Sequence, residues 1–175
     1  MSGLYELADT ALKIGLGAMI SGFSAYWLSN SQYKRNAQAQ REQQQRALIE
    51  DAAVQAEQIH YIFLKYFELI QEYMHSVQNR YEWPQTRRSE LYLVLDELVQ
   101  GFNNLTSAES KLLLLNEKNL YKCLRKMRSR IIFFRRQFYI DKKDLNEQEA
   151  LEIRRDVGKM REEFFDALSA KYAEM

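Results

Sequence analysis

The chain has 175 residues, of which 46% are hydrophobic, 28% are charged and 13% are aromatic, and its formal net charge is +1 at pH 7. This composition excludes a disordered polar chain, and the near-zero charge excludes a global electrostatic attraction to nucleic acid or another polyanion. The single cysteine, Cys123, excludes an internal disulfide and a multi-cysteine zinc site, and it fits a reducing compartment.

The spacing of apolar residues predicts an all-α fold. One proline and six glycines are too few for the turns of a β-rich domain, and apolar residues recur every three or four positions from Leu48 to Tyr172. We expect an N-terminal membrane-spanning or buried apolar helix, followed by an antiparallel helical bundle. The expected parts are a transmembrane anchor helix over 1–30, a polar glutamine-rich juxtamembrane helix over 31–46, and a cytoplasmic bundle over 47–175.

The least polar segment of the chain is close in length to a membrane span. Residues 14–33 carry no charge. A helix from Ala11 to Ser29 covers about 28 Å, against about 30 Å of hydrocarbon in a bilayer, provided that the ammonium of Lys13 reaches the interface. Four basic residues follow the segment: Lys34, Arg35, Arg41 and Arg46. By the positive-inside rule, the bundle is then cytoplasmic and the N-terminus lies outside.

Small residues recur along this segment at alternating spacings of four and three, which places them on one face of a helix. They are Ala11, Gly15, Ala18, Gly22, Ala25 and Ser29. Because a face of small side chains lets a second helix approach closely in lipid, we expect a helix–helix interface here, with a second copy or another membrane subunit. The alternative is a soluble helical oligomer that buries residues 11–29 between subunits.

The rest of the chain contains further apolar stripes of helical period. They predict helices over about 47–80, 89–103, 120–138 and 153–172. The first has an expected core stripe from Ala52 to Val77, and the third has one formed by Leu120, Leu124, Met127, Ile131, Phe134 and Phe138. Pro84 ends the first of them, and the segment 101–110 is expected to break the chain. Two residue pairs have the spacing of a helix N-terminal cap: Thr106 with Glu109, and Asp144 with Glu147.

The segment 117–143 is strongly basic, with ten basic residues against two acidic ones and a local charge of +8. One interpretation is ion pairing with the acidic residues of the last helix. The other is binding of phosphates from lipid or nucleic acid, by Lys118, Lys122, Arg125, Lys126, Arg128, Arg135 and Arg136. Because no nucleic-acid motif accompanies these residues, the sequence disfavours a nucleic-acid partner.

The only two histidines follow glutamates by three residues, as Glu57 with His60 and Glu72 with His75. This spacing occurs in carboxylate-bridged di-metal sites, but there the two motifs lie on different helices. Here both lie on one helix, about 22 Å apart, so one chain cannot bring them to a single metal. With no glycine-rich phosphate loop either, we expect no enzymatic activity, no metal and no cofactor.

Together these patterns predict a single-pass, membrane-anchored helical protein that docks, scaffolds or senses and is not an enzyme. We expect it to form a homo-oligomer, or to bind another membrane subunit through its N-terminal helix, and to contact membrane lipid. One alternative is an oligomeric pore-forming membrane effector, for which Ser21 and Ser24 offer only a weak polar lining. The other is a soluble helical homo-oligomer or assembly protein.

Overall fold

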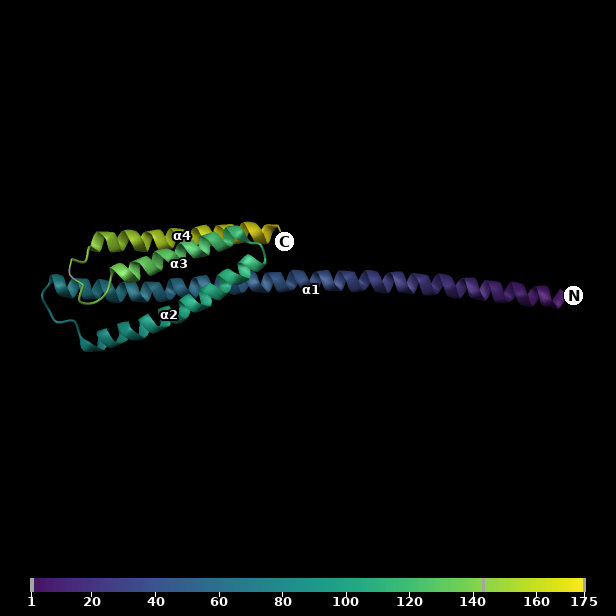
Figure 1. Cartoon of the computed structure of the whole chain (residues 1–175), viewed down its shortest axis with the longest axis horizontal. Coiled ribbons are helices and arrows are strands. Elements are labelled where there is room, and N and C mark those ends of the chain that lie inside the picture. Colours follow the sequence, from purple (N-terminus) through teal and green to yellow (C-terminus); the bar gives the residue numbers. More distant parts are fainter. Residues whose placement is uncertain (1, 143, 175) are drawn as a thin grey trace. The chain divides into compact units, whose positions relative to one another are not determined.

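In the computed structural model, the described residues form four helices and no strand, which confirms the predicted all-α class. The helices are α1 (Ser2–Gln78), α2 (Gln85–Leu114), α3 (Lys118–Gln137) and α4 (Glu147–Ala173) (Figure 1). The structure describes the backbone of residues 2–142 and 144–174, and the side chains of residues 32, 35–36, 38–142 and 144–174.

The chain divides into two units, Met1–Gln44 and Gln45–Met175. The described backbone of the first unit belongs entirely to helix α1. The second unit is a helical bundle, made by the C-terminal part of α1 together with α2, α3 and α4. Within the part of the chain that the structure describes, no helix has a stretch both long enough and apolar enough to cross a bilayer.

Short connections make successive helices of the bundle antiparallel (Figure 1). Their turns contain four non-glycine residues with φ between 59° and 66°, namely Arg80, Asn116, Asp141 and Asp144. Asparagine and aspartate adopt this left-handed conformation more readily than other residues that carry a Cβ atom. Three of these four positions therefore have a residue type that favours a positive φ. The left-handed positions in the described turns are thus formed without glycine.

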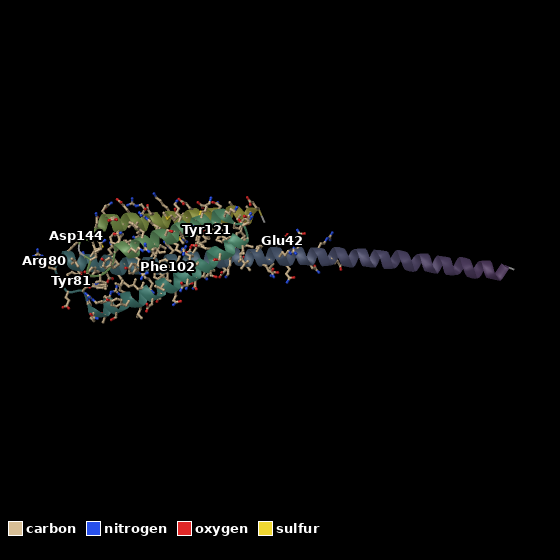
Figure 2. The ribbon with its side chains drawn as sticks, in the orientation of Figure 1. Glu42, Arg80, Tyr81, Phe102, Tyr121 and Asp144 are labelled. Carbon is tan, nitrogen blue, oxygen red and sulfur yellow. The ribbon has the colours of Figure 1, made fainter. Side chains whose placement is uncertain are left out.

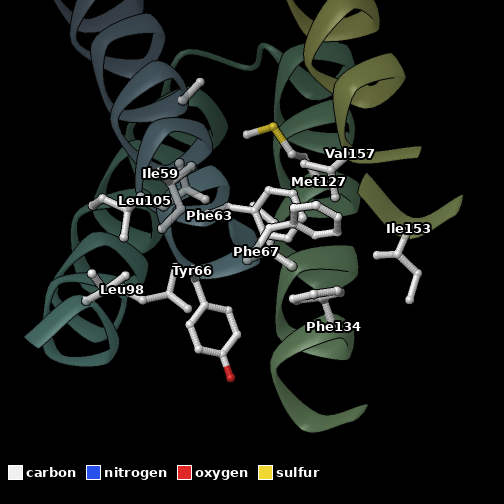
Figure 3. Close-up of a cluster of buried hydrophobic side chains, with 14 of the residues drawn as sticks. Ile59, Phe63, Tyr66, Phe67, Leu98, Leu105, Met127, Phe134, Ile153 and Val157 are labelled. Carbon is white, nitrogen blue, oxygen red and sulfur yellow. The ribbon is translucent and has the colours of Figure 1, made fainter. Parts of the chain in front are cut away.

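The core follows most of the predicted stripes. Every core residue predicted for the stripe over 120–138 is buried: Leu120, Leu124, Met127, Ile131 and Phe134 on α3, and Phe138 directly after it. The rings of Phe63 and Phe134 meet edge to face, with their centroids 5.4 Å apart, at the centre of the bundle (Figure 3). The stripe on α1 is buried from Ala52 to Tyr73, but Val77, in the last turn of the helix, is 57% exposed and does not belong to the core as predicted.

Helix α2 continues through residues 101–110, so the predicted break there is wrong. Gly101 is buried against α1, where a Cβ atom would lie only 2.7 Å from Cδ1 of Ile59. The glycine thus permits a close approach of two helices and does not end one. The hydroxyl of Thr106 donates to the carbonyl of Phe102 at 2.8 Å, inside the helix, and so does not cap a new helix.

Helix α4 also begins differently from the prediction, because its cap is not the pair of Asp144 with Glu147. The residue before the helix is Asn146, whose side chain accepts a hydrogen bond from the backbone N–H of Glu149 at 3.2 Å. Asp144 lies in the preceding turn with a positive φ. The cap therefore lies two residues later than predicted, with an asparagine in the same role.

Two tyrosine hydroxyls of α1 hold the connection between α3 and α4. The hydroxyl of Tyr66 donates to the carbonyl of Phe138 at 2.7 Å, and the backbone N–H of Asp141 donates to the hydroxyl of Tyr73 at 2.9 Å. Burial raises the pKa of Tyr66 to about 12, against a smaller lowering by Arg135. The phenol is therefore protonated at every physiological pH and remains a hydrogen-bond donor.

Candidate binding surface on helix α3

Helix α3 separates its apolar and cationic side chains onto different faces, with the apolar stripe buried in the bundle. The seven predicted anion-binding residues all lie outside that stripe. Six of them are exposed, and Arg128 is half-buried. Figure 2 shows the side chains along this helix, where Tyr121 is labelled near its N-terminal end. The exposed surface of α3 therefore carries cations, and those without an ion-pair partner are the ones available to a ligand.

Two cations of α3 pair with acidic residues of α4. Nζ of Lys126 lies 3.2 Å from a carboxylate oxygen of Glu163, and Nη2 of Arg130 lies 2.5 Å from one of Asp156. This is the pairing between the two helices that the sequence predicts. Because both pairs are partly exposed to water, each contributes at most about 1 kcal/mol to stability. Lys126 is accordingly less available to a ligand than the other exposed cations.

Arg128 points to α2 and pairs with Glu109, a partner that the sequence analysis missed. Its Nε lies 2.8 Å from Oε1 of Glu109, without the alignment of a hydrogen bond, while Nη1 donates to Oγ1 of Thr106 at 3.0 Å. The Glu109 side chain is only 6% exposed, and burial raises the pKa of its carboxyl even though Arg128 lowers it. The sequence could have revealed this pair, because Glu109 lies within the apolar stripe of α2, between Leu105 and Leu112.

Five of the seven predicted residues have no carboxylate partner within the described part of the chain: Lys118, Lys122, Arg125, Arg135 and Arg136. Four of these, Lys118, Lys122, Arg125 and Arg136, share one side of the helix, which we call the α3 cationic face. It extends over about 27 Å, from the 1.5 Å rise per residue.

The α3 cationic face also contains polar and aromatic groups. Nη1 of Arg125 donates to the hydroxyl of Tyr121 at 2.8 Å, and its guanidinium lies over the same ring. Phe133, between Arg125 and Arg136 in the sequence, is 39% exposed. A row of cations with an exposed aromatic ring can bind several phosphates at once, and such binding weakens as salt increases.

The two histidine motifs lie at different places in the bundle. His60 is half-buried near α4, where burial first and the nearby Arg161 second lower the pKa of its imidazole. Its neighbour Glu57 forms an ion pair with Arg161. His75 lies near the end of α1, beside Asn79. Among the described residues, no three histidine, cysteine, aspartate or glutamate side chains gather closely enough to hold a metal ion.

Cys123 lies on α3 between Lys122 and Arg125 and is half-buried. Burial raises the pKa of its thiol, and the carboxylate of Glu163 adds to this, while Lys126 opposes it. The thiol is therefore mostly protonated near neutral pH, which makes it a weak nucleophile. Its surroundings do not support a role in covalent chemistry.

The predicted helix–helix interface lies outside the residues whose side chains the structure describes. It comprises Ala11, Gly15, Ala18, Gly22, Ala25 and Ser29. Their backbone belongs to helix α1, so the helical spacing on which the prediction depends is present. The face itself stays a prediction.

No protein-family model, curated protein or solved structure matches this chain. The choice of a function therefore depends on the chemistry of the sequence and on the geometry of the bundle. The α3 cationic face has four exposed cations that form no ion pair within the described part of the chain, and it is the candidate for binding.

Proposed function

We propose that this protein is a single-pass, membrane-anchored interaction module without enzymatic activity of its own. In this proposal, residues 11–29 span the bilayer, with the N-terminus outside, and associate with a second helix. The cytoplasmic bundle uses the α3 cationic face to bind anionic lipid headgroups. The observation that carries the proposal is that the uncharged segment 14–33 lies within helix α1, Ser2–Gln78, and precedes a run of basic side chains.

The helical backbone supports the anchor for a physical reason. Every peptide N–H and C=O in a bilayer must be satisfied within the segment, which a helix does. The length is marginal, so the proposal requires the ammonium of Lys13 to extend to the headgroups. Tyr26, Trp27 and Tyr33 stand near one end of the segment, where aromatic side chains favour the interface.

Fractionation of cells tests the anchor directly. The full chain and a version that begins at Tyr33 are expressed, and the membranes are washed with alkaline carbonate. We expect only the full chain to remain in the washed pellet. Solubility of both versions without detergent would refute the anchor and favour the soluble helical oligomer, with residues 11–29 buried between subunits.

Cross-linking in membranes tests the helix–helix interface. Gly15→Ile with Gly22→Ile places branched side chains on the small-residue face and should weaken self-association, because the partner backbone can no longer approach. Gly17→Ile is the matched control, since Gly17 lies in the same segment but off this face. Equal cross-linking of all three proteins would show that the face is not the interface. A conductance in liposomes would favour the pore-forming alternative.

A fluorophore on α3 tests the lipid contact. Bimane is attached at Ser129→Cys in a Cys123→Ser background, in the full chain reconstituted in nanodiscs. We expect a blue shift of its emission when the discs contain phosphatidylglycerol in place of phosphatidylcholine, and loss of that shift in 1 M salt, where the Debye length falls to about 3 Å. Identical emission in both lipids would refute the contact.

Charge-neutral variants identify the cations that make the contact. Lys122→Gln with Arg125→Gln should remove most of the blue shift. Arg155→Gln with Lys159→Gln removes the same charge from exposed positions on α4 and should leave the shift unchanged. Equal effects of the two double variants would mean that net charge matters, and not the α3 cationic face.

A further inference from the structure

A second candidate site lies at the end of the bundle where α1 ends and α2 begins. A cavity of about 630 Å³ opens there, and no residue of α3 lines it. Its lining comes from the last turns of α1, the following connection and the first residues of α2 and α4: Glu68, Gln71, Glu72, His75, Tyr81, Trp83, Pro84, Arg87 and Glu147. Figure 2 places Tyr81, next to Arg80, at this end of the bundle. The cavity is thus separate from the α3 cationic face.

Trp83 gives the first indication of a ligand. The residue is only 6% exposed, and its ring packs edge to face on Tyr73, with centroids 5.4 Å apart. Its indole Nε1 is buried and has no hydrogen-bond acceptor within the described part of the chain. A buried donor without an acceptor is costly, and Trp83 lines the cavity. A ligand that offers a carbonyl oxygen to Nε1 would remove this cost, and because Nε1 is covered in the free protein, the side chains over it must shift when the ligand binds.

The charges around the cavity give a second and independent indication. Arg87 is already engaged, because its guanidinium donates to the carboxylates of both Glu72 and Glu90. Glu68 and Glu147, in contrast, are exposed and have no cationic partner among the described residues. The cavity therefore has two carboxylates that an incoming cation can pair with, while its own arginine is neutralised.

The walls suit a flat cation on an apolar stem. Tyr81 is 50% exposed, and its ring lies 6.2 Å from that of His75. An exposed tyrosine ring attracts a guanidinium, which also forms paired hydrogen bonds with a carboxylate. Pro84 adds an apolar surface for the methylene stem. A lysine ammonium would use the carboxylates but would gain less from the ring.

We propose that this cavity binds an arginine-bearing peptide segment of a partner protein. The guanidinium pairs with Glu68 and Glu147 beside the ring of Tyr81, and a backbone carbonyl of the peptide accepts a hydrogen bond from Nε1 of Trp83. The site goes beyond the membrane anchoring and lipid contact described above and does not depend on either. It gives the bundle a protein ligand as well as an anionic one.

The indole N–H resonance of Trp83 tests this proposal. The full chain carries two tryptophans, so Trp27→Phe leaves one indole signal in protein labelled with ¹⁵N-tryptophan and held in detergent micelles. The probe is N-acetyl-Gly-Arg-Gly-amide. We expect a saturable downfield shift of the indole proton, because the N–H gains an acceptor. No shift at any peptide concentration would overturn the proposal.

Two comparisons test the chemistry of recognition. The same peptide with citrulline in place of arginine keeps the shape and loses the charge, and we expect about tenfold weaker binding. Ethylguanidinium keeps the cation and lacks the carbonyl, so the indole proton should stay nearly at its position in the free protein. Citrulline peptide binding with the affinity of the arginine peptide, or an equal indole shift with ethylguanidinium, would refute recognition of an arginine peptide.

Matched glutamate variants locate the site. Glu68→Gln with Glu147→Gln should weaken peptide binding about tenfold, with the indole resonance of the free protein in its original position. Glu162→Gln is the control, because Glu162 is an exposed glutamate of α4 that does not line the cavity. Equal weakening by the control, or unchanged binding in the double variant, would place the peptide elsewhere.

Discussion

The buried pair of Glu109 with Arg128 makes the sharpest prediction about stability. Arg128→Met keeps the aliphatic stem and removes the cation, which leaves a carboxylate that is only 6% exposed without its ion-pair partner and with Arg125 as the remaining cation that lowers its pKa. Breaking a buried pair in this way costs about 3 kcal/mol at pH 7. Glu109→Gln should cost less than about 1 kcal/mol, because Arg128 is 24% exposed and keeps its hydrogen bond to Thr106.

The loss in Arg128→Met should depend on pH. Burial already raises the pKa of Glu109 above its usual 4.5, and without Arg128, which lowers it, the pKa rises further. The folded state then binds the proton more tightly than the unfolded state, so stability is greatest at low pH and falls as the pH rises through the folded pKa. The loss of about 3 kcal/mol at pH 7 should therefore largely disappear near pH 4.

Guanidinium titration of the full chain in micelles measures these values, with Trp83 as the reporter of bundle unfolding in a Trp27→Phe background. We expect Arg128→Met to cost less than about 1 kcal/mol when Glu109→Gln is already present, so the two sites are coupled by at least about 2 kcal/mol. The reasoning would be refuted if Arg128→Met lost the same free energy of unfolding with Glu109 as with Glu109→Gln. It would also be refuted if Arg128→Met lost the same free energy at pH 4 as at pH 7.

Three further predictions use the same titration or a simple labelling assay. Phe134→Ala should cost about 4 kcal/mol because the ring is fully buried, whereas Phe133→Ala, at a 39% exposed position, should cost less than about 1.5 kcal/mol; similar losses would contradict the assigned core. Burial lowers the pKa of His60 below 6.5, so stability should fall as the pH drops from 7.5 to 5.5, and His60→Gln should flatten this dependence. Because burial raises the pKa of Cys123, iodoacetamide should modify it more slowly than free cysteine at pH 8 and at a similar rate after denaturation.

The helical fold could be predicted from the sequence because the apolar spacing is a local signal that burial reinforces. The stripe that begins at Leu120 on α3 and ends at Phe138, directly after the helix, is buried at every predicted position. The predicted break at 101–110 was wrong because glycine and hydroxyl residues can either end a helix or lie within one. Gly101 admits Ile59 of another helix, and only the tertiary contact distinguishes that use from a helix end.

The candidate surface could be predicted only in part, because composition gives charges but not partners. The sequence identified the cations of α3 but expected their ion pairs on α4, whereas Arg128 pairs with Glu109 of α2. The cavity at the end of α1 left no periodic signal. Trp83 and Glu147 line it together although 64 positions separate them in the numbering, and only the folded chain brings them there.

The hydrogen bonds from Tyr66 and Tyr73 to the connection after α3 have a consequence for synthesis. Their partners, Phe138 and Asp141, come 72 and 68 residues later in the chain. Contacts of such long sequence separation form late, so the aromatic side of α1 has no complete core until most of the chain has left the ribosome. During that interval the aromatic side of α1 is exposed to chaperones and to other nascent copies of the chain.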